Sequence, residues 1–148
     1  MYGKQLIKYI TIFLIFSVAY YFIEKIFSGS SNWSSLLMGG IGGILISFIN
    51  YFYYYSTPKW KQISLTTFIM IFIELVGGLI LRAFGFEFWN YSGRFMSVEG
   101  LICFRYSVYW LGLSIVALNL EDYIDYIYFN GDKPDRLIVY VKKLVSGK

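Results

Sequence analysis

Residues 63–81 decide the fold, and they read ISLTTFIMIFIELVGGLIL. This stretch is almost continuously apolar and has about the 20-residue length that a helix needs to cross a bilayer. One carboxylate, Glu74, lies inside it. An ionised carboxylate at that depth costs at least about 2.5–3.5 kcal/mol on insertion scales. We therefore expect Glu74 to be paired, protonated or exposed to water, and it is the first candidate for a functional residue.

The composition of the whole chain supports a membrane protein. Of the 148 residues, 57% are hydrophobic and only 15% are charged, whereas soluble domains carry about 25% charged residues. Further apolar runs of spanning length occupy residues 6–27, 35–55 and 101–120. The sequence predicts an all-α integral membrane protein with four transmembrane helices. We expect residues 1–120 to form the transmembrane domain and residues 121–148 a cytoplasmic, amphipathic tail.

The basic residues predict the orientation of the chain, because Lys and Arg are enriched on the cytoplasmic side of short loops. The N-terminus and the second loop carry four of them, and the opposite side also carries four: Lys25, Arg82, Arg94 and Arg105. The lysines and the arginine of the tail break this tie. We expect a multi-pass protein of the cell membrane with both termini in the cytoplasm. The net charge of +4 then favours contact with anionic membrane lipids, not with nucleic acid.

Several kinds of chemistry are excluded by composition. There is no histidine and only one cysteine, Cys103. The commonest general base, the commonest metal ligand and any internal disulfide are therefore missing. We predict no catalytic residue, no metal site and no cofactor, and we expect a protein that is not an enzyme.

Small residues predict where helices approach one another closely. Gly39 and Gly43 form a GxxxG pattern, while Gly77 and Gly78 share a helix face with Glu74. Such spacing allows close helix packing, so we expect Glu74 to point into the bundle. Arg105 is the expected charged partner, and a serine or tyrosine hydroxyl or exposed backbone would also serve. The carboxylate could bind a ligand or a proton, or it could hold helices together.

The segment 85–100 is too polar to span the membrane and too apolar for a free linker. We expect an interfacial loop between the third and fourth helices. The candidate ligand-binding residues are Glu74, Arg105 and five residues of this loop: Trp89, Asn90, Tyr91, Ser92 and Arg94. This loop could form a lid over a site reached from outside, or a simple interfacial belt of aromatic residues.

The tripeptide Phe-Ile-Glu occurs twice, at residues 22–24 and 72–74. The repetition suggests two parallel halves of two helices each. The depths of the two carboxylates differ, however. Glu24 falls near a helix end, and Glu74 lies about 16 Å into its helix.

The tail predicts a helix. Asp132 can cap it, with Pro134 in the first turn. Five apolar residues then follow at helical spacing: Leu137, Ile138, Val141, Leu144 and Val145. This helix could lie on the membrane, dock a cytoplasmic partner, or pack against the protein's own loops.

At this point the chain resembles a known family. Glu74, residues 88–92 (FWNYS), residues 100–103 (GLIC) and Trp110 are similar to the second half of the CmpB-like family of Putative ABC-transporter type IV membrane proteins. That family has aspartate where this chain has Asn90, and arginine where it has Leu101. Its first-half motifs are absent here, and Gly39-Gly40 stands in their place. The resemblance implies a four-helix membrane protein that is a transporter component.

These observations give one favoured function and two alternatives. The favoured one is a permease-like or accessory subunit of a transport system, with its polar site under the loop that follows the third helix. The ATPase would be a separate chain, since the sequence has no nucleotide-binding motif. Four helices make a narrow bundle, so we expect a homodimer, or a complex with another membrane or cytoplasmic subunit. The alternatives are a small membrane enzyme that acts on lipid head groups and a non-catalytic membrane scaffold.

Overall fold

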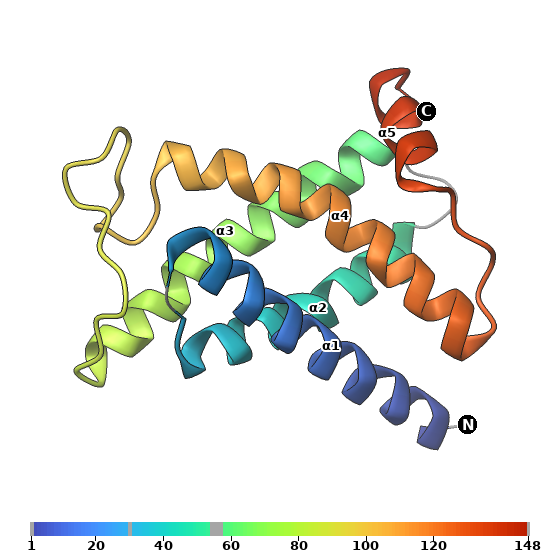
Figure 1. Ribbon diagram of the computed structural model, residues 1–148, viewed down its shortest axis with the longest axis horizontal. Coiled ribbons are helices and arrows are strands. Elements are labelled where there is room, and N and C mark those ends of the chain that lie inside the picture. Colours follow the sequence, from blue (N-terminus) through green and yellow to red (C-terminus); the bar gives the residue numbers. More distant parts are fainter. Residues whose placement is uncertain (1, 30, 54–57, 148) are drawn as a thin grey trace.

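The computed structural model describes residues 2–29, 31–53 and 58–147, and it is helical. The five helices are α1 (Tyr2–Ser28), α2 (Trp33–Tyr53), α3 (Lys59–Ala83), α4 (Phe104–Phe129) and α5 (Leu137–Val145), as Figure 1 shows. Outside them, a single antiparallel bridge joins Val98 and Ile102 in the part of the chain that is described. The predicted all-α class is confirmed.

Three helices are long and apolar enough to cross a membrane: α1, α2 and α3. Four spans were expected, and α4 does not meet the same criterion. Its second half carries Glu121, Asp122 and Asp125, which lower its mean hydropathy. The fourth span and the twofold repeat therefore stay predictions.

The bounds of α4 differ from those expected. The helix starts at Phe104 because residues 98–102 form a tight turn, with Val98 and Ile102 exchanging backbone hydrogen bonds. It continues past Leu120 to Phe129. There Asn130 takes a left-handed conformation, φ 56°, which is a common way for a helix to end. The expected boundary between residues 120 and 121 thus falls inside a continuous helix.

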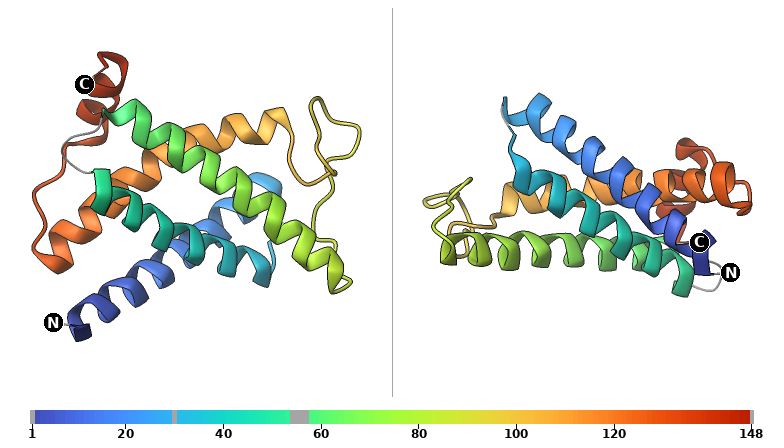
Figure 2. Two further views of the ribbon diagram at one scale, coloured as in Figure 1. Left: turned by 180° about the vertical axis from the view of Figure 1, so that it is seen from behind. Right: turned by 90° about the horizontal axis from the view of Figure 1, so that it is seen from below.

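The helices form a bundle with two distinct ends. In Figure 1 the N-terminus, the start of α3 and helix α5 lie at the right-hand end. The loop between α3 and α4 lies at the left-hand end, and we call residues 84–103 the α3–α4 loop. Figure 2 shows α1 running beside α2, with α3 and α4 packed together. Both termini therefore lie at the same end of the bundle.

Glycines allow α1 and α2 to approach closely. A Cβ atom on Gly39 would lie 2.8 Å from the backbone oxygen of Phe16, and one on Gly43 would lie 2.6 Å from the Phe16 Cβ. Gly78 makes a different contact: its missing side chain leaves room for Leu101, which is only 2% exposed. Gly77 has ordinary spacing, with its nearest neighbour, Met38 Sδ, at 3.7 Å from an added Cβ.

The interior of the described bundle holds polar as well as apolar residues, and its outer faces expose large apolar side chains. The buried side chains are polar as often as apolar, and α3 buries a stripe of Thr66, Met70, Glu74 and Gly78. The outer face of α1 exposes large apolar side chains: Leu6, Ile10, Leu14, Val18, Phe22 and Ile26. This distribution suits a protein whose surroundings are lipid.

Helix α5 begins later than expected. It starts at Leu137, and Asp132 and Pro134 lie in the non-helical segment before it. The expected cap is therefore wrong. That segment is held instead by Asn119, whose Nδ2 donates to the backbone oxygen of Asp135 at 3.0 Å.

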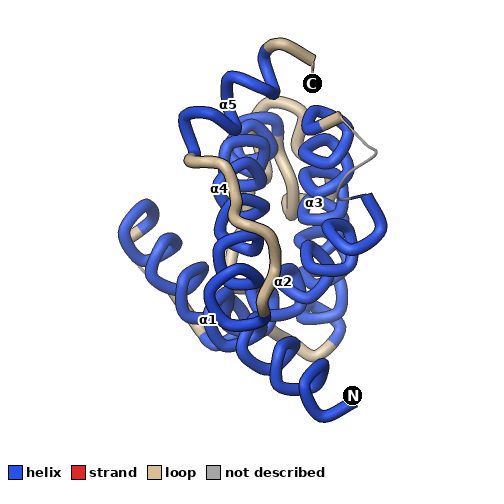
Figure 3. Tube along the Cα trace, turned by 90° about the vertical axis from the view of Figure 1, so that its right-hand side faces the viewer, coloured by secondary structure: helices blue, strands red, loops and turns tan. Residues whose placement is uncertain are grey.

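Figure 3 views the bundle from the right-hand end of Figure 1 and shows α5 at its upper edge. Its buried residue is Tyr140, 1% exposed, and Leu144 packs beside it on the core. Ile138 and Val145 remain exposed, at 66% and 83%. One edge of α5 therefore packs on the protein itself, while much of its apolar stripe stays open.

Candidate functional site

Glu74 lies at the meeting point of three segments. Its side chain on α3 is 5% exposed. Oε2 accepts a hydrogen bond from Nε1 of Trp110 on α4, at 2.9 Å. Oε1 accepts one from the hydroxyl of Tyr91 in the α3–α4 loop, at 3.3 Å. We call Glu74, Tyr91 and Trp110 the carboxylate site.

The backbone of the loop sets the position of Tyr91. The Tyr91 N–H donates to the Gly100 carbonyl at 2.6 Å, and the Asn90 side-chain oxygen accepts the Ser92 N–H at 2.8 Å. Gly100 has φ +68°, and an added Cβ there would lie 2.7 Å from the Asn90 and Ser92 side chains. Only glycine fits this crossing point without strain. The loop is therefore closed on itself beside Glu74.

Trp89 holds Leu101, the loop residue that packs on the bundle. Its Nε1 donates to the Leu101 backbone oxygen at 3.0 Å, and Leu101 itself inserts beside Gly78 of α3. Asn90 Nδ2 donates to the Glu87 carboxylate at 3.0 Å. Trp89, Asn90 and Ser92 thus serve the shape of the loop, and Tyr91 alone among the expected loop residues hydrogen-bonds to Glu74 in the described structure.

Tyr91 is also held from its outer side. Its ring stacks on Tyr106 with centroids 4.5 Å apart, and the Arg94 guanidinium lies over both rings, at 5.9 and 5.5 Å. Burial, and next the charge of Glu74, raise the pKa of Tyr91 well above its ordinary range. The Tyr91 hydroxyl therefore keeps its proton and remains a hydrogen-bond donor at physiological pH.

Arg105 is not the partner of Glu74. Its side chain is exposed, and its Nε donates to the Tyr109 hydroxyl at 3.0 Å. Arg105 lies five positions before Trp110, which places the two residues about 140° apart around α4. Since Trp110 faces α3, Arg105 faces away. Glu74 receives two uncharged donors in place of the expected cation.

A second carboxylate lies close to this site. Glu24 of α1 accepts hydrogen bonds from the hydroxyls of Ser31, at 3.2 Å, and of Ser35. It is near enough to Glu74 for their charges to interact. Tyr20 lies one helical turn before Glu24 on α1. The ring of Tyr20 stacks on Trp110 with centroids 5.4 Å apart. The two copies of Phe-Ile-Glu therefore bring their carboxylates to one region, which their different depths in the sequence did not suggest.

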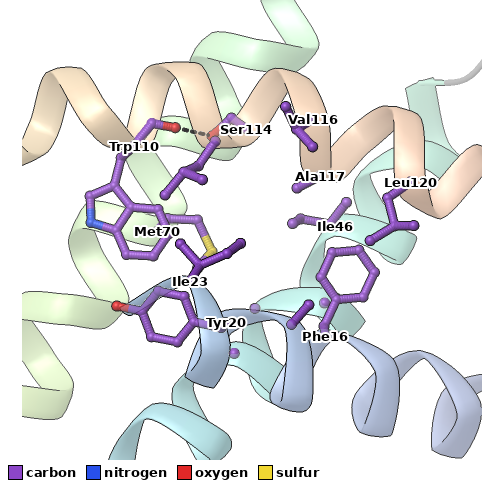
Figure 4. Close-up of a pocket in the computed structure, with 15 residues that line it drawn as sticks. Phe16, Tyr20, Ile23, Ile46, Met70, Trp110, Ser114, Val116, Ala117 and Leu120 are labelled. Atoms are coloured by element: carbon purple, nitrogen blue, oxygen red, sulfur yellow. Dashed lines mark hydrogen bonds between the residues drawn. The ribbon is translucent and has the colours of Figure 1, made fainter. Parts of the chain in front are cut away.

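An apolar cavity of about 80 Å³ adjoins Tyr20 and Trp110. Figure 4 shows its walls, with residues of α1 below facing residues of α4 above. Tyr20 and Trp110 lie at one end, and Phe16, Ile46 and Leu120 lie toward the other. Glycines 39, 42 and 43 of α2 leave the space that side chains would otherwise fill.

A second buried polar cluster lies toward the other end of α4, and the sequence analysis did not find it. Nδ2 of Asn50 on α2 donates to Asp122 at 2.7 Å and also to Glu121. All three side chains are at least 94% buried. The sequence predicts these carboxylates in the cytoplasmic, amphipathic tail. The signal for their burial is Asn50, an amide near the end of an apolar run.

The same cluster contacts the remaining helices. Lys8 of α1 pairs with Asp125 at 2.5 Å, and the Lys59 ammonium lies 4.7 Å from the centre of the Tyr140 ring. Burial, and next the charge of Asp122, raise the pKa of Tyr140 above its ordinary range. Polar contacts thus join α2 and α1 to α4, and α3 to α5, which suits a structural role. Across residues 2–29, 31–53 and 58–147, no group of three or more His, Cys, Asp or Glu side chains could hold a metal ion.

Comparison with known proteins gives one match. The sequence profile of a family described as Putative ABC-transporter type IV matches residues 11–141. No curated protein and no solved structure matches the chain. The matched region includes α2, α3 and α4 completely and extends from within α1 into α5, so it covers Glu24, Glu74 and the cavity.

Proposed function

The chain belongs to the family described as Putative ABC-transporter type IV, and from that premise we propose that it is a permease-like or accessory subunit of a membrane transport system. Its polar site is the carboxylate site of Glu74, Tyr91 and Trp110. Glu74 binds the transported solute or the proton that accompanies it. Tyr91 and Trp110 hold the carboxylate in place.

One observation carries this proposal. Glu74 is 95% buried and accepts two hydrogen bonds from uncharged donors. The ion pairs of the described chain join other residues. A carboxylate has about four acceptor positions, so two donors leave capacity for a further ligand. A buried charge without a counter-charge is costly, and a cationic ligand or a proton would remove that cost.

The proposed arrangement in the membrane has four crossings. Helix α4 has 26 residues, and at about 1.5 Å per residue it is long enough to span. Glu121 and Asp122 are buried against Asn50, so these charges need not face lipid. Because both termini lie at one end of the bundle (Figure 1), an even number of crossings fits the fold. The excess of basic residues in the tail places that end in the cytoplasm.

A transport system would need further subunits. We propose that the ATPase is a separate chain and that this protein associates with it, with another membrane subunit or with a second copy of itself. The exposed part of α5, with Lys142 and Lys143 on its polar side, is the proposed contact with cytoplasmic partners or with anionic lipid.

The substitution Glu74→Gln tests the proposed role. Glutamine keeps the size and the acceptor oxygen of the side chain but removes its charge. We expect the purified variant to unfold in detergent at nearly the same denaturant concentration as the wild-type protein. In cells that lack the protein, we expect the variant to fail to restore wild-type behaviour. Glu99→Gln, in the exposed part of the same loop, serves as the matched control and should restore it.

A second candidate function, a non-catalytic scaffold, is favoured by one feature of the same site. Both hydrogen bonds of Glu74 come from its own chain and join α3, α4 and the loop. If this role is the correct one, Glu74→Gln should lose stability, and its activity in cells should fall only in proportion. That result would overturn the transport proposal.

A further inference from the structure

We propose that the carboxylate site and the adjoining cavity bind an amphiphilic organic cation, with a substituted ammonium head at Glu74 and an apolar chain in the cavity. This inference rests on the proposed function and names the class of solute for that site. Four observations carry it: the charge of the site, its aromatic walls, the lining of the cavity and their alignment along the bundle.

The charge of the site favours a cation. Glu74 has two uncharged hydrogen-bond donors, and no Lys or Arg of the described chain forms an ion pair with it. Glu24 brings a second carboxylate near the site, because it lies one helical turn after Tyr20, whose ring stacks on Trp110. An anionic solute would be repelled by the ionised carboxylate, whereas a cation would supply the counter-charge that the site lacks.

The walls of the site favour a substituted ammonium over a small metal ion. Tyr20 stacks on Trp110, the residue that bonds Glu74, and both rings line the cavity. Aromatic faces attract ammonium groups and are the common way in which proteins recognise quaternary ammonium ligands. A hard metal ion would instead need a larger set of oxygen ligands.

The cavity favours an apolar chain behind the head group. Its lining is aliphatic and aromatic, with Tyr20 and Ser114 as its hydroxyl-bearing residues. From Trp110 to Leu120 it follows α4 for ten residues, about 15 Å of helical rise. Apolar cavities of this kind remain dry and accept apolar ligands.

The alignment of these parts matches the shape of an amphiphile. Figure 4 shows Tyr20 and Trp110 at one end of the cavity and Phe16 and Leu120 at the other. Trp110 bonds Glu74, so the charged group lies beyond the aromatic end. The polar and apolar parts of one molecule could therefore occupy both regions together.

Binding to the intact protein tests this inference. The protein is placed in nanodiscs of phosphatidylcholine, and radiolabelled octyltrimethylammonium is measured by equilibrium dialysis against empty nanodiscs. Octanol and octyl sulfate, with the same chain but no charge or a negative charge, are the competitors. We expect the cation to bind at least about tenfold more tightly than either, a difference of about 1.4 kcal/mol. Equal binding of all three compounds would overturn the proposal. This comparison uses the wild-type protein alone, so it does not depend on whether a variant folds.

Variants then test the binding of the ammonium head and of the apolar chain of the ligand separately. Glu74→Gln should weaken binding of octyltrimethylammonium at least about tenfold, while Glu99→Gln should leave it unchanged. The wild-type protein should bind octyltrimethylammonium more tightly than tetramethylammonium, which lacks the octyl chain. Ala117→Leu narrows the cavity and should reduce this difference in affinity. An unchanged affinity in folded Glu74→Gln protein would contradict the assignment of the head group.

Failure of this inference can be told from failure of the proposed function. If Glu74→Gln is stable but inactive in cells, and the wild-type protein ignores the cation, the transport role stands and the solute belongs to another class. If the cation binds and Glu74→Gln remains active in cells, the site exists and the transport role of Glu74 is wrong.

Discussion

Gly100 shows how one residue sets the geometry of the site. It holds the α3–α4 loop with φ +68°, and its carbonyl accepts the Tyr91 N–H that positions the hydroxyl near Glu74. In the sequence it is part of the GLIC stretch that carries the family resemblance. The structure gives a physical reason for glycine there, because both the conformation and the space exclude a side chain.

The substitution Gly100→Ala should therefore destabilise the protein by more than backbone strain alone. Strain at a positive φ costs about 1–3 kcal/mol, and contact with Asn90 and Ser92 at 2.7 Å adds about 1–3 kcal/mol more. Gly93→Ala is the matched control, because φ there is +85° and nothing lies within 4 Å. Unfolding in detergent, followed by tryptophan fluorescence, measures both. Equal losses for the two variants would contradict the crowded crossing point.

Element packing explains which glycines matter. Gly39 and Gly77 were both expected at helix contacts, but their surroundings differ. An added Cβ on Gly39 meets the backbone oxygen of Phe16 at 2.8 Å, and α1 cannot move away without losing its contact with α2. At Gly77 the nearest atom, Met38 Sδ, is 3.7 Å away, which is an ordinary contact.

The pair Gly39→Ala and Gly77→Ala tests this difference. Gly39→Ala should cost about 1–3 kcal/mol from overpacking. Gly77→Ala should be neutral or slightly stabilising, because alanine is better than glycine in a helix by about 1 kcal/mol. Denaturant titration in the same detergent compares them. A larger loss at Gly77 would show that α2 and α3, not α1 and α2, make the closer contact.

At the scale of the whole molecule, the number of crossings decides where the site opens. Both termini lie at one end and the α3–α4 loop at the other (Figure 1). If the fold is inserted as proposed, the loop over Glu74 faces outward and α5 faces the cytoplasm. A solute would then reach the carboxylate site from outside or from the bilayer.

Single-cysteine labelling in right-side-out vesicles tests this topology. In a Cys103→Ala background, Phe95→Cys in the loop should react with an impermeant maleimide, since Phe95 is 75% exposed. Lys4→Cys and Lys142→Cys, both exposed, should react only after the vesicles are opened. Labelling of Lys4→Cys and Lys142→Cys from opposite sides would mean an odd number of crossings and would exclude α4 as a fourth span.

The sequence by itself determined the helical class, the three helices that are apolar enough to span a membrane, and the family; the fourth span that it predicted stays a prediction. These follow from the length and composition of continuous segments, which need no knowledge of what lies opposite them. It also selected Glu74 and Tyr91, because a carboxylate in an apolar run and a polar aromatic loop are local features. The start of α5 was misplaced, since a possible cap at Asp132 says nothing of the Asn119 bond that holds the segment before it.

Only the tertiary structure decided which side chains contact one another. It gave Glu74 the indole of Trp110, turned Arg105 outward and brought Glu24 near Glu74. It also joined Asn50 to Glu121 and Asp122, across 71 and 72 residues of sequence. Which side chains meet depends on the rotation and crossing of packed helices, and several rotations satisfy the same hydropathy pattern. The charge and depth of Glu74 could be inferred from the chain, but its uncharged hydrogen-bond partners could be found only once the helices were packed.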